Sequence, residues 1–208
     1  MADLTLARVR ENAERIRAEI GAGVELLAAV KYLDAEQLPV LAEAGVTLLG
    51  ENRAQELERK AAAHPGAFTW DFIGHLQSRK VKQVLPHVRL IHSVASNSVL
   101  EQLGKHAPAG TEVLVEVNIA RDPGKSGVDP GELDAFLARV PENVRVSGLM
   151  TMPPLAERPE DNRRWFAALA QLAADRGLER LSMGTSQDYA VAAQEGATIV
   201  RIGTTLYR

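Results

Sequence analysis

Residues 180–204 read RLSMGTSQDYAVAAQEGATIVRIGT, and this stretch contains one full unit of the predicted fold. Short apolar runs predict strands from Arg180 to Gly184 and from Thr198 to Gly203. The segment between them, Gln187 to Glu195, has the pattern of a helix. A strand, a helix and a second strand in this order form the connection that joins neighbouring strands of a parallel sheet.

The same alternation runs back to the start of the sequence. Six further strands are predicted, at Leu26 to Tyr32, Val46 to Asn52, Thr69 to Gly74, Arg89 to Val94, Glu112 to Ile119 and Val144 to Met152. Helices are predicted at Ala35 to Ala44, Ala54 to Ala63, Ser78 to Leu85, Pro130 to Arg139 and Pro159 to Arg176. Eight strand–helix repeats indicate an α/β fold, a (β/α)₈ TIM barrel, with an open doubly wound sheet as the alternative.

The amino-terminal segment is expected to cover the side where the barrel closes. Only Thr204 to Arg208 follow the last predicted strand, which is too short for a covering helix. Leu4 to Ile20 forms an amphipathic pattern that could take this place. Because no linker rich in Pro, Gly or Ser divides the sequence, residues 1–208 are expected to form a single domain.

Composition excludes several classes of protein. The 208 residues carry a formal net charge of -3 without a long basic run, so a nucleic-acid partner is not expected. The absence of cysteine excludes disulfides and thiolate catalysis. Charged residues interrupt the amino terminus, so neither a signal peptide nor a membrane span is predicted. No His/Asp/Glu cluster has metal-ligand spacing, and the default expectation is a cytoplasmic monomer.

Polar and glycine residues recur where the predicted strands end. In a TIM barrel these positions share the rim that carries the active site. Lys31 follows an apolar run, which indicates a partly buried amine capable of Schiff-base chemistry, although an isolated lysine at a strand end is more often a surface residue. The full set is Lys31, Asn52, Gly74, Ser93, Asn118, Thr151, Gly184 and Gly203.

The last two strands are followed by a predicted phosphate site. Gly184 and Ser186 precede a predicted helix, so amides and a hydroxyl would converge on an anion. Gly203 and Thr204 would add donors after the eighth strand, where this fold commonly binds phosphate. In the alternative interpretation each residue has only a local structural role, the serine as an N-cap and the glycine as a turn residue. If the Lys31 amine faces this site, the amine and the phosphate site together would hold a phosphorylated aldehyde.

Arg201 alternates with apolar neighbours and is expected to point into the barrel. A buried guanidinium needs a partner. An ion pair with Glu51 or Glu116 is one interpretation, and contact with the pyridine nitrogen of a cofactor is the other. The segment 122–127 lacks the spacing of a Walker motif and is interpreted as a rim loop.

In these segments the sequence resembles the pyridoxal phosphate homeostasis family, whose fold is similar to the barrel domain of alanine racemase. The resemblance spans nearly the whole length. It is carried by AVKY at 29–32, GEN at 50–52, FIGHLQ at 72–77, KSG at 125–127, GLMT at 148–151, SMGTSQD at 182–188 and VRIGT at 200–204.

The resemblance implies pyridoxal 5′-phosphate (PLP) as the cofactor. It implies that Lys31 forms the Schiff base, that Arg201 faces the ring nitrogen, and that the remaining contacts come from Asn52, Met183, Ser186, Gly203 and Thr204. It also implies the absence of the second domain that gives alanine racemase its opposing tyrosine. In this sequence Val30 and Thr185 replace residues common in the family.

The leading hypothesis is a PLP carrier without robust catalysis, which maintains the intracellular PLP supply and delivers it to apo-enzymes; no catalytic residue is assigned. The alternative is an amino-acid racemase-like PLP enzyme with His75 or Tyr189 as a second base. A third possibility is an aldolase-like barrel that uses Lys31 on a phosphosugar.

Overall fold

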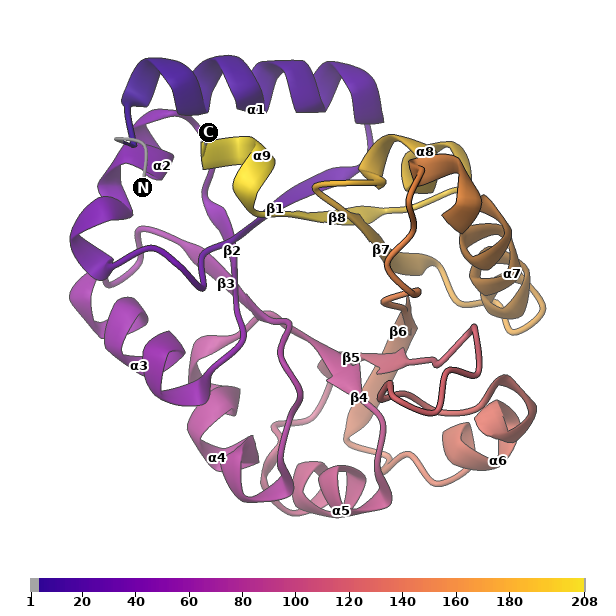
Figure 1. Cartoon of the computed structure of the whole chain (residues 1–208). Helices are drawn as coiled ribbons and strands as arrows, with labels where there is room; N and C mark the ends of the chain where they lie inside the picture. The colour runs from indigo at the N-terminus through magenta and orange to yellow at the C-terminus, as the bar shows by residue number, and fades with distance from the viewer. Residues whose placement is uncertain (1–3, 208) are drawn as a thin grey trace.

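The computed structural model describes residues 4–207, and its strands form a closed parallel barrel in chain order (Figure 1). β8 pairs with β1, with Leu26 opposite Val200, and this pairing closes the barrel. The predicted TIM barrel is therefore confirmed over the open sheet. The strands are β1 (Glu25–Ala29), β2 (Leu48–Glu51), β3 (Thr69–Phe72), β4 (Leu90–Val94), β5 (Thr111–Glu116), β6 (Val144–Met150), β7 (Arg180–Thr185) and β8 (Ile199–Ile202).

Helices surround the barrel on its outer side (Figure 1). The α-helices are α1 (Leu6–Ile20), α2 (Pro39–Glu43), α3 (Ala54–Ala63), α4 (Val81–Val84), α5 (Asn97–His106), α6 (Leu133–Leu137), α7 (Arg163–Ala174), α8 (Tyr189–Gln194) and α9 (Thr204–Tyr207). Short 3-10 helices lie at Ala35–Gln37, Ser78–Lys80, Leu85–His87, Pro130–Glu132 and Pro159–Asn162. None of the helices within residues 4–207 combines the length and the apolar composition that crossing a bilayer requires.

Four predicted helices, those at 35–44, 78–85, 130–139 and 159–176, are divided in the structure into a 3-10 turn and an α-helix. Pro130 and Pro159 each stand at the first helical position, where the missing amide hydrogen costs nothing. Pro86 follows α4, and because it cannot donate the next helical hydrogen bond, the chain continues as a 3-10 turn. Proline therefore fixes the tight turns at the ends of these segments.

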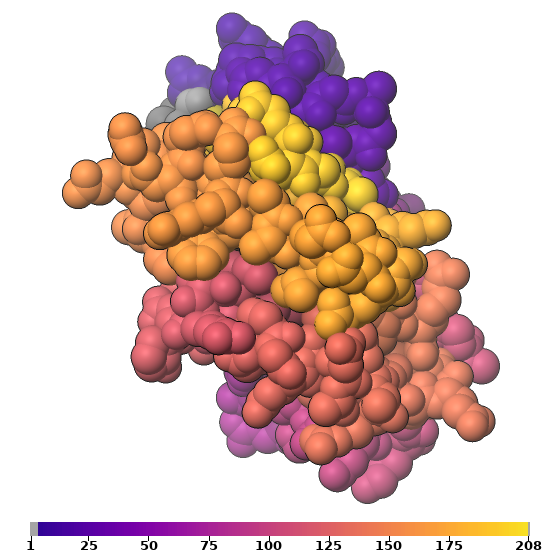
Figure 2. Space-filling view, turned by 90° about the vertical axis from the view of Figure 1, so that its right-hand side faces the viewer, coloured from indigo at the N-terminus to yellow at the C-terminus, as the bar shows by residue number. Residues whose placement is uncertain are grey.

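α1 covers the closing side of the barrel, as the apolar stripe predicted. Val9, Ala13, Ile16 and Ile20 are buried on its inner face. This helix packs against α2, α8, α9 and β1. Figure 2 shows the indigo amino-terminal helix beside the yellow carboxyl-terminal segment. Gly21 ends the helix with φ of 81°, a left-handed conformation that favours glycine.

Side chains alternate between two environments along each strand. Leu27, Leu90, Leu114, Met150 and Ile199 pack together in one cluster inside the barrel. The larger core lies between the sheet and the helices. Four polar side chains that hydrogen-bond to one another are also buried on the strands, namely Asp71, His92, Ser182 and Arg201. A buried polar group is costly unless it is hydrogen-bonded, so the partners of these four matter for both stability and function.

The amino end of the barrel carries paired charges. Arg89 contacts Glu25 at 2.6 Å and Asp71 at 2.8 Å. Arg180 lies 3.5 Å from both Glu25 and Glu112. Arg145 also pairs with Glu112. We call these six residues the amino-end ion-pair cluster: Glu25, Asp71, Arg89, Glu112, Arg145 and Arg180.

Candidate cofactor site

A cavity of about 330 Å³ opens at the carboxyl ends of the strands. The residues that line it come from the ends of six strands and from the rim loop 122–127, so the predicted rim is where the polar residues meet. They are Asn52, Ile73, Gly74, His75, Ser93, Glu116, Gly124, Lys125, Ser126, Met150, Met152 and Arg201. In TIM barrels this end of the sheet carries the active or binding site.

Arg201 supplies a buried cation to this cavity, with 5% of its surface exposed. Its Nη1 donates to Ser182 Oγ at 2.6 Å, and its Nη2 donates to the carbonyl oxygen of Thr151 at 2.9 Å. Glu51 pairs with Lys60, and Glu116 accepts a hydrogen bond from Ser126, so the ion pair considered for Arg201 is not formed. Within residues 4–207 no carboxylate lies within ion-pair distance of this guanidinium.

Burial lowers the pKa of Arg201 to about 10, although the more distant carboxylates Asp188 and Glu116 oppose this shift. The side chain therefore remains protonated at neutral pH. A buried positive charge whose contacts are a hydroxyl, a carbonyl and the sulfur of Met152 is suited to bind an electron-rich group entering the cavity.

Asn52 also lines the cavity, and its side chain contains a hydrogen-bond acceptor without a partner among residues 4–207. Its Oδ1 atom is buried and has no hydrogen-bond partner in the described part of the chain. Gly74 lies directly against the Asn52 backbone, where a Cβ atom would approach the carbonyl oxygen to 2.1 Å. Glycine is therefore required at this position, and a donor from a bound molecule would satisfy Asn52.

The residues of the predicted phosphate site lie together after β7 and β8. Ser186 Oγ accepts hydrogen bonds from the amides of Gly203 at 3.1 Å and Thr205 at 3.4 Å. Thr205 Oγ1 also donates to the Ser186 carbonyl oxygen at 3.2 Å. We call this arrangement the Ser186–Gly203 cradle, in which two amide donors converge on one oxygen, here that of Ser186 itself. The helix predicted from Gln187 begins two residues later, at Tyr189, and Thr204 is the first residue of α9.

Lys31 stands at the same rim, but it is exposed rather than partly buried as predicted. β1 ends at Ala29, so the lysine lies in the following turn. Its Nζ lies 4.6 Å from the ring centroid of Tyr32, a cation–π contact. Because β8 pairs with both β7 and β1, Lys31 and the Ser186–Gly203 cradle follow neighbouring strands.

A buried ion pair, which the sequence analysis did not identify, supports the start of this turn. Lys60 and Glu51 each have 1% side-chain exposure, and Lys60 Nζ lies 2.6 Å from Glu51 Oε2. Lys60 also donates to the Val30 carbonyl oxygen at 2.8 Å, and Glu51 Oε1 accepts from the Asn52 amide at 2.7 Å. The pair therefore holds the backbone next to both Lys31 and Asn52.

Of the cofactor contacts named from the sequence, Asn52 and Arg201 line the cavity, whereas Lys31, Met183, Ser186, Gly203 and Thr204 do not. Met183 and Tyr189 lie farthest from the predicted arrangement. Met183 is fully buried in the core between the sheet and the helices, because strand alternation places Ser182 inside the barrel and its neighbour outside. Tyr189 lies on α8 and bonds to Glu19 and Arg15 of α1. Neither side chain lines the cavity, whereas His75 does.

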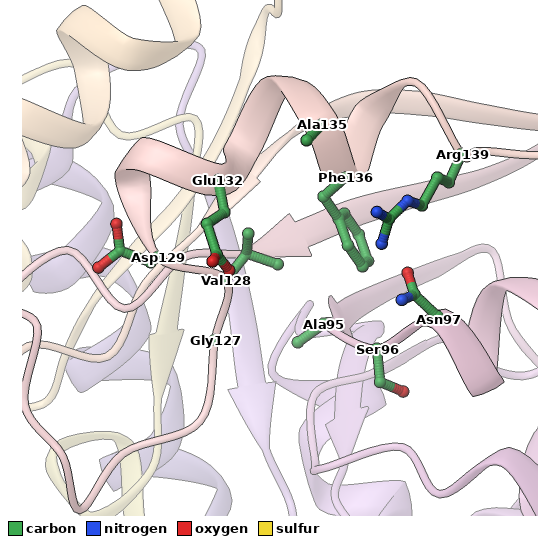
Figure 3. A pocket seen from close by; sticks show the side chains of 10 residues that line it. All are labelled: Ala95, Ser96, Asn97, Gly127, Val128, Asp129, Glu132, Ala135, Phe136 and Arg139. Carbon is green, nitrogen blue, oxygen red and sulfur yellow. The ribbon is translucent and has the colours of Figure 1, made fainter.

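A second cavity, of about 440 Å³, lies outside the barrel between the start of α5 and α6 (Figure 3). Phe136 and Arg139 face Asn97 across it. The buried side-chain atoms without a partner in residues 4–207 belong to Asn52 and Ser147, and neither residue lines this cavity. The smaller cavity at the rim is therefore the better candidate site.

Comparison with known proteins identifies the family. Residues 4–208 match the model for the alanine racemase N-terminal domain. The pyridoxal phosphate homeostasis protein of Aquifex aeolicus (strain VF5) is 39% identical, over 97% of this chain and 95% of the relative. The protein of the same name from Pseudomonas aeruginosa is 38% identical, over 97% and 90%. The chain belongs to the pyridoxal phosphate homeostasis protein family.

Solved structures agree with this assignment. PipY from Synechococcus elongatus PCC7942, determined with PLP bound, is similar to this chain with a TM-score of 0.86 and 31% identity, covering 96% of this chain and 100% of PipY. Alanine racemase from Corynebacterium glutamicum has a TM-score of 0.81 at 16% identity, and the match covers 99% of this chain but 62% of the racemase. The second likeness concerns the fold alone.

Proposed function

We propose that this protein binds PLP at the rim cavity, holds it through a Schiff base on Lys31, and maintains intracellular PLP homeostasis without robust catalysis. The names of its relatives and the PLP-bound PipY structure support the choice of cofactor. PLP supplies a reactive aldehyde and an electron-withdrawing ring when it is bound.

The observation that carries the proposal is the grouping of three complementary features at one rim. The Ser186–Gly203 cradle suits the phosphate, and Lys31 follows the strand next to β8. Arg201 stands in the cavity as a cation without a paired carboxylate, where it would donate to the pyridine nitrogen. Asn52 and Thr204 complete the proposed contacts.

The surroundings of the site support the proposal of weak catalysis. A guanidinium that stays protonated at neutral pH would donate a hydrogen bond to the ring nitrogen without giving it a proton, so electron withdrawal by the ring would be weak. Of the two second bases considered, Tyr189 faces α1 and His75 alone lines the cavity. An exposed Lys31 would also leave the linkage open to transfer to apo-enzymes.

Absorption spectra of PLP-loaded protein test the linkage. The wild type is expected to show an imine band that borohydride reduction converts into a stable adduct, which peptide mass spectrometry places on Lys31. Lys31→Ala is expected to lose both the band and the adduct. Lys125→Ala is the matched control, since Lys125 is the lysine that lines the cavity, and it is expected to keep both. An unchanged band in Lys31→Ala would overturn the assignment.

The racemase-like alternative is favoured by one observation, the position of His75 at the cavity. Exchange of the α-proton of amino acids in D₂O discriminates between the two functions. Turnover on the order of once per second or faster, lost in His75→Ala, would establish an enzyme. The homeostasis proposal expects exchange far below that rate and the same exchange in both proteins.

A further inference from the structure

Four buried side chains connect the amino-end ion-pair cluster to the cofactor cavity through the barrel interior. Arg201 Nη1 lies 2.6 Å from Ser182 Oγ, and Ser182 Oγ lies 2.8 Å from His92 Nδ1. His92 Nε2 lies 3.0 Å from Asp71 Oδ2. The four residues come from β8, β7, β4 and β3. We call Asp71, His92, Ser182 and Arg201 the interior hydrogen-bond network.

The direction of every hydrogen bond in this network is fixed by its two ends. Arg201 only donates, so Ser182 Oγ accepts from Nη1. At the other end the Asp71 carboxylate only accepts, so a neutral His92 donates from Nε2, and its Nδ1 accepts from the Ser182 hydroxyl. His92 therefore carries its proton on Nε2 and donates it to the Asp71 carboxylate. One neutral tautomer of His92 satisfies all four groups.

The electrostatics of the site agree with this arrangement. Burial lowers the pKa of His92, in opposition to the nearby Asp71 carboxylate, so the imidazole stays neutral. Burial alone would raise the pKa of Asp71, but hydrogen bonds from His92 and Arg89 outweigh that effect and lower it. The carboxylate is thus ionised and faces the imidazole, which in turn faces the serine.

This network leaves Arg201 little freedom to rotate. Ser182 holds one terminal nitrogen, and the Thr151 carbonyl oxygen and Met152 Sδ contact the other. If the Ser182 hydroxyl were lost, a buried N–H of a charged group would lack its acceptor, and the guanidinium would turn to find another. The orientation presented to the cavity thus depends on Ser182, and the orientation of the Ser182 hydroxyl depends on His92.

We propose that Ser182, His92 and Asp71 are positioning residues that fix the orientation of Arg201 and thereby tune how the bound PLP ring is held. This inference rests on the proposed function, in which Arg201 donates to the ring nitrogen. Ser182 acts directly on the guanidinium, His92 acts through Ser182, and Asp71 acts through both. The influence on the cofactor should therefore decrease in that order.

Three variants and one matched control test the proposal. Ser182→Ala, His92→Gln and Asp71→Asn remove successive links. Ser147→Ala is the control, because it also removes a buried serine hydroxyl from a barrel strand, yet Ser147 Oγ has no hydrogen-bond partner within residues 4–207. For each protein, the dissociation constant for PLP, the absorption maximum of the bound PLP and the urea midpoint are measured.

Ser182→Ala is expected to weaken PLP binding about threefold to tenfold and to shift the absorption maximum, with a small change in the urea midpoint. Asp71→Asn is expected to have the smallest effect on the cofactor but the largest on stability, because Asp71 also accepts hydrogen bonds from Arg89. Ser147→Ala is expected to match the wild type in both cofactor measurements.

Two outcomes would overturn the inference. One is a Ser182→Ala protein with the wild-type affinity and absorption maximum. The other is a set of variants whose cofactor changes rank with their loss of stability, which a purely structural role would produce. If the wild type itself bound no PLP, the proposed function would fail instead, so the two failures are distinguishable.

Discussion

The arginines at the two ends of the barrel have opposite kinds of partner. At the amino end, Arg89, Arg145 and Arg180 each pair with a carboxylate of the same protein. At the carboxyl end, Arg201 is more deeply buried and is held by a hydroxyl and a carbonyl oxygen. The first arrangement neutralises charge within the fold, and the second keeps it available to a ligand. Substituting one arginine at each end should therefore separate stability from binding.

The largest expected effect is on stability at the amino end. Arg89→Met would leave Asp71, a fully buried carboxylate, with His92 as its remaining side-chain partner. Breaking such a buried pair costs about 3 kcal/mol of unfolding free energy. Urea denaturation measures this loss. Arg145→Met is the control, because the Arg145 side chain is 65% exposed and an exposed pair contributes below about 1 kcal/mol. Equal losses in the two variants would contradict the comparison.

An intermediate effect is expected at the carboxyl end, and on binding. Arg201→Met removes a buried cation that has no paired carboxylate, so the unfolding free energy should change by less than about 1 kcal/mol. The affinity for PLP should fall at least about tenfold, because a charge-assisted hydrogen bond to the ring is lost. PLP titration followed by absorbance measures the affinity. Wild-type affinity in this variant would show that Arg201 does not contact the cofactor.

The smallest effect is a dependence of stability on pH. His92 has a lowered pKa in the folded protein, so the unfolded chain takes up a proton first, near its ordinary pKa of about 6.5. The stability is thus fully present above that pH and decreases below it, by at most about 1.4 kcal/mol per pH unit. Asp71 contributes in a separate, more acidic pH range, because its pKa is also lowered in the folded protein. Its contribution to stability is lost as the pH falls through its folded-state pKa.

Urea midpoints between pH 7.5 and 5.5 measure this dependence. Desolvation, together with charge repulsion from Lys82 and Lys105, also lowers the pKa of His106. The informative quantity is therefore the difference between the wild type and His92→Gln. The wild type should lose more stability over this range than the variant. Parallel curves would show that His92 is not buried in its neutral form.

The fold was predictable because its signal is repeated. Each of the eight apolar runs became a strand, and the Val9-to-Ile20 stripe covered the closing side as expected. The predicted ends of the strands were less accurate. β1 stops at Ala29, and Lys31 lies exposed in the turn beyond it. A sequence pattern predicts which residues form a strand, but the pairing with neighbouring strands determines where it ends.

The relative positions of the proposed site residues were predictable in part. Motif spacing brought Ser186 and Gly203 together correctly, because both follow adjacent strands. Strand alternation would have placed Met183 outside the barrel, had it been applied to β7 as it was to Arg201. The sequence analysis did not identify Lys60, although it lies three and six residues after Leu57 and Ala54, on the buried face of α3. Its carboxylate partner could be known only from the packing of α3 against β2.

The Glu51–Lys60 pair has an evolutionary consequence. A mutation of Glu51 alone would leave the Lys60 ammonium buried without its carboxylate. A mutation of Lys60 alone would leave the Glu51 carboxylate unpaired and would also release the carbonyl of Val30. A paired change to apolar residues would avoid the buried unpaired charge. We therefore expect the two positions beside Lys31 to covary among relatives, with a change at one accompanied by a change at the other.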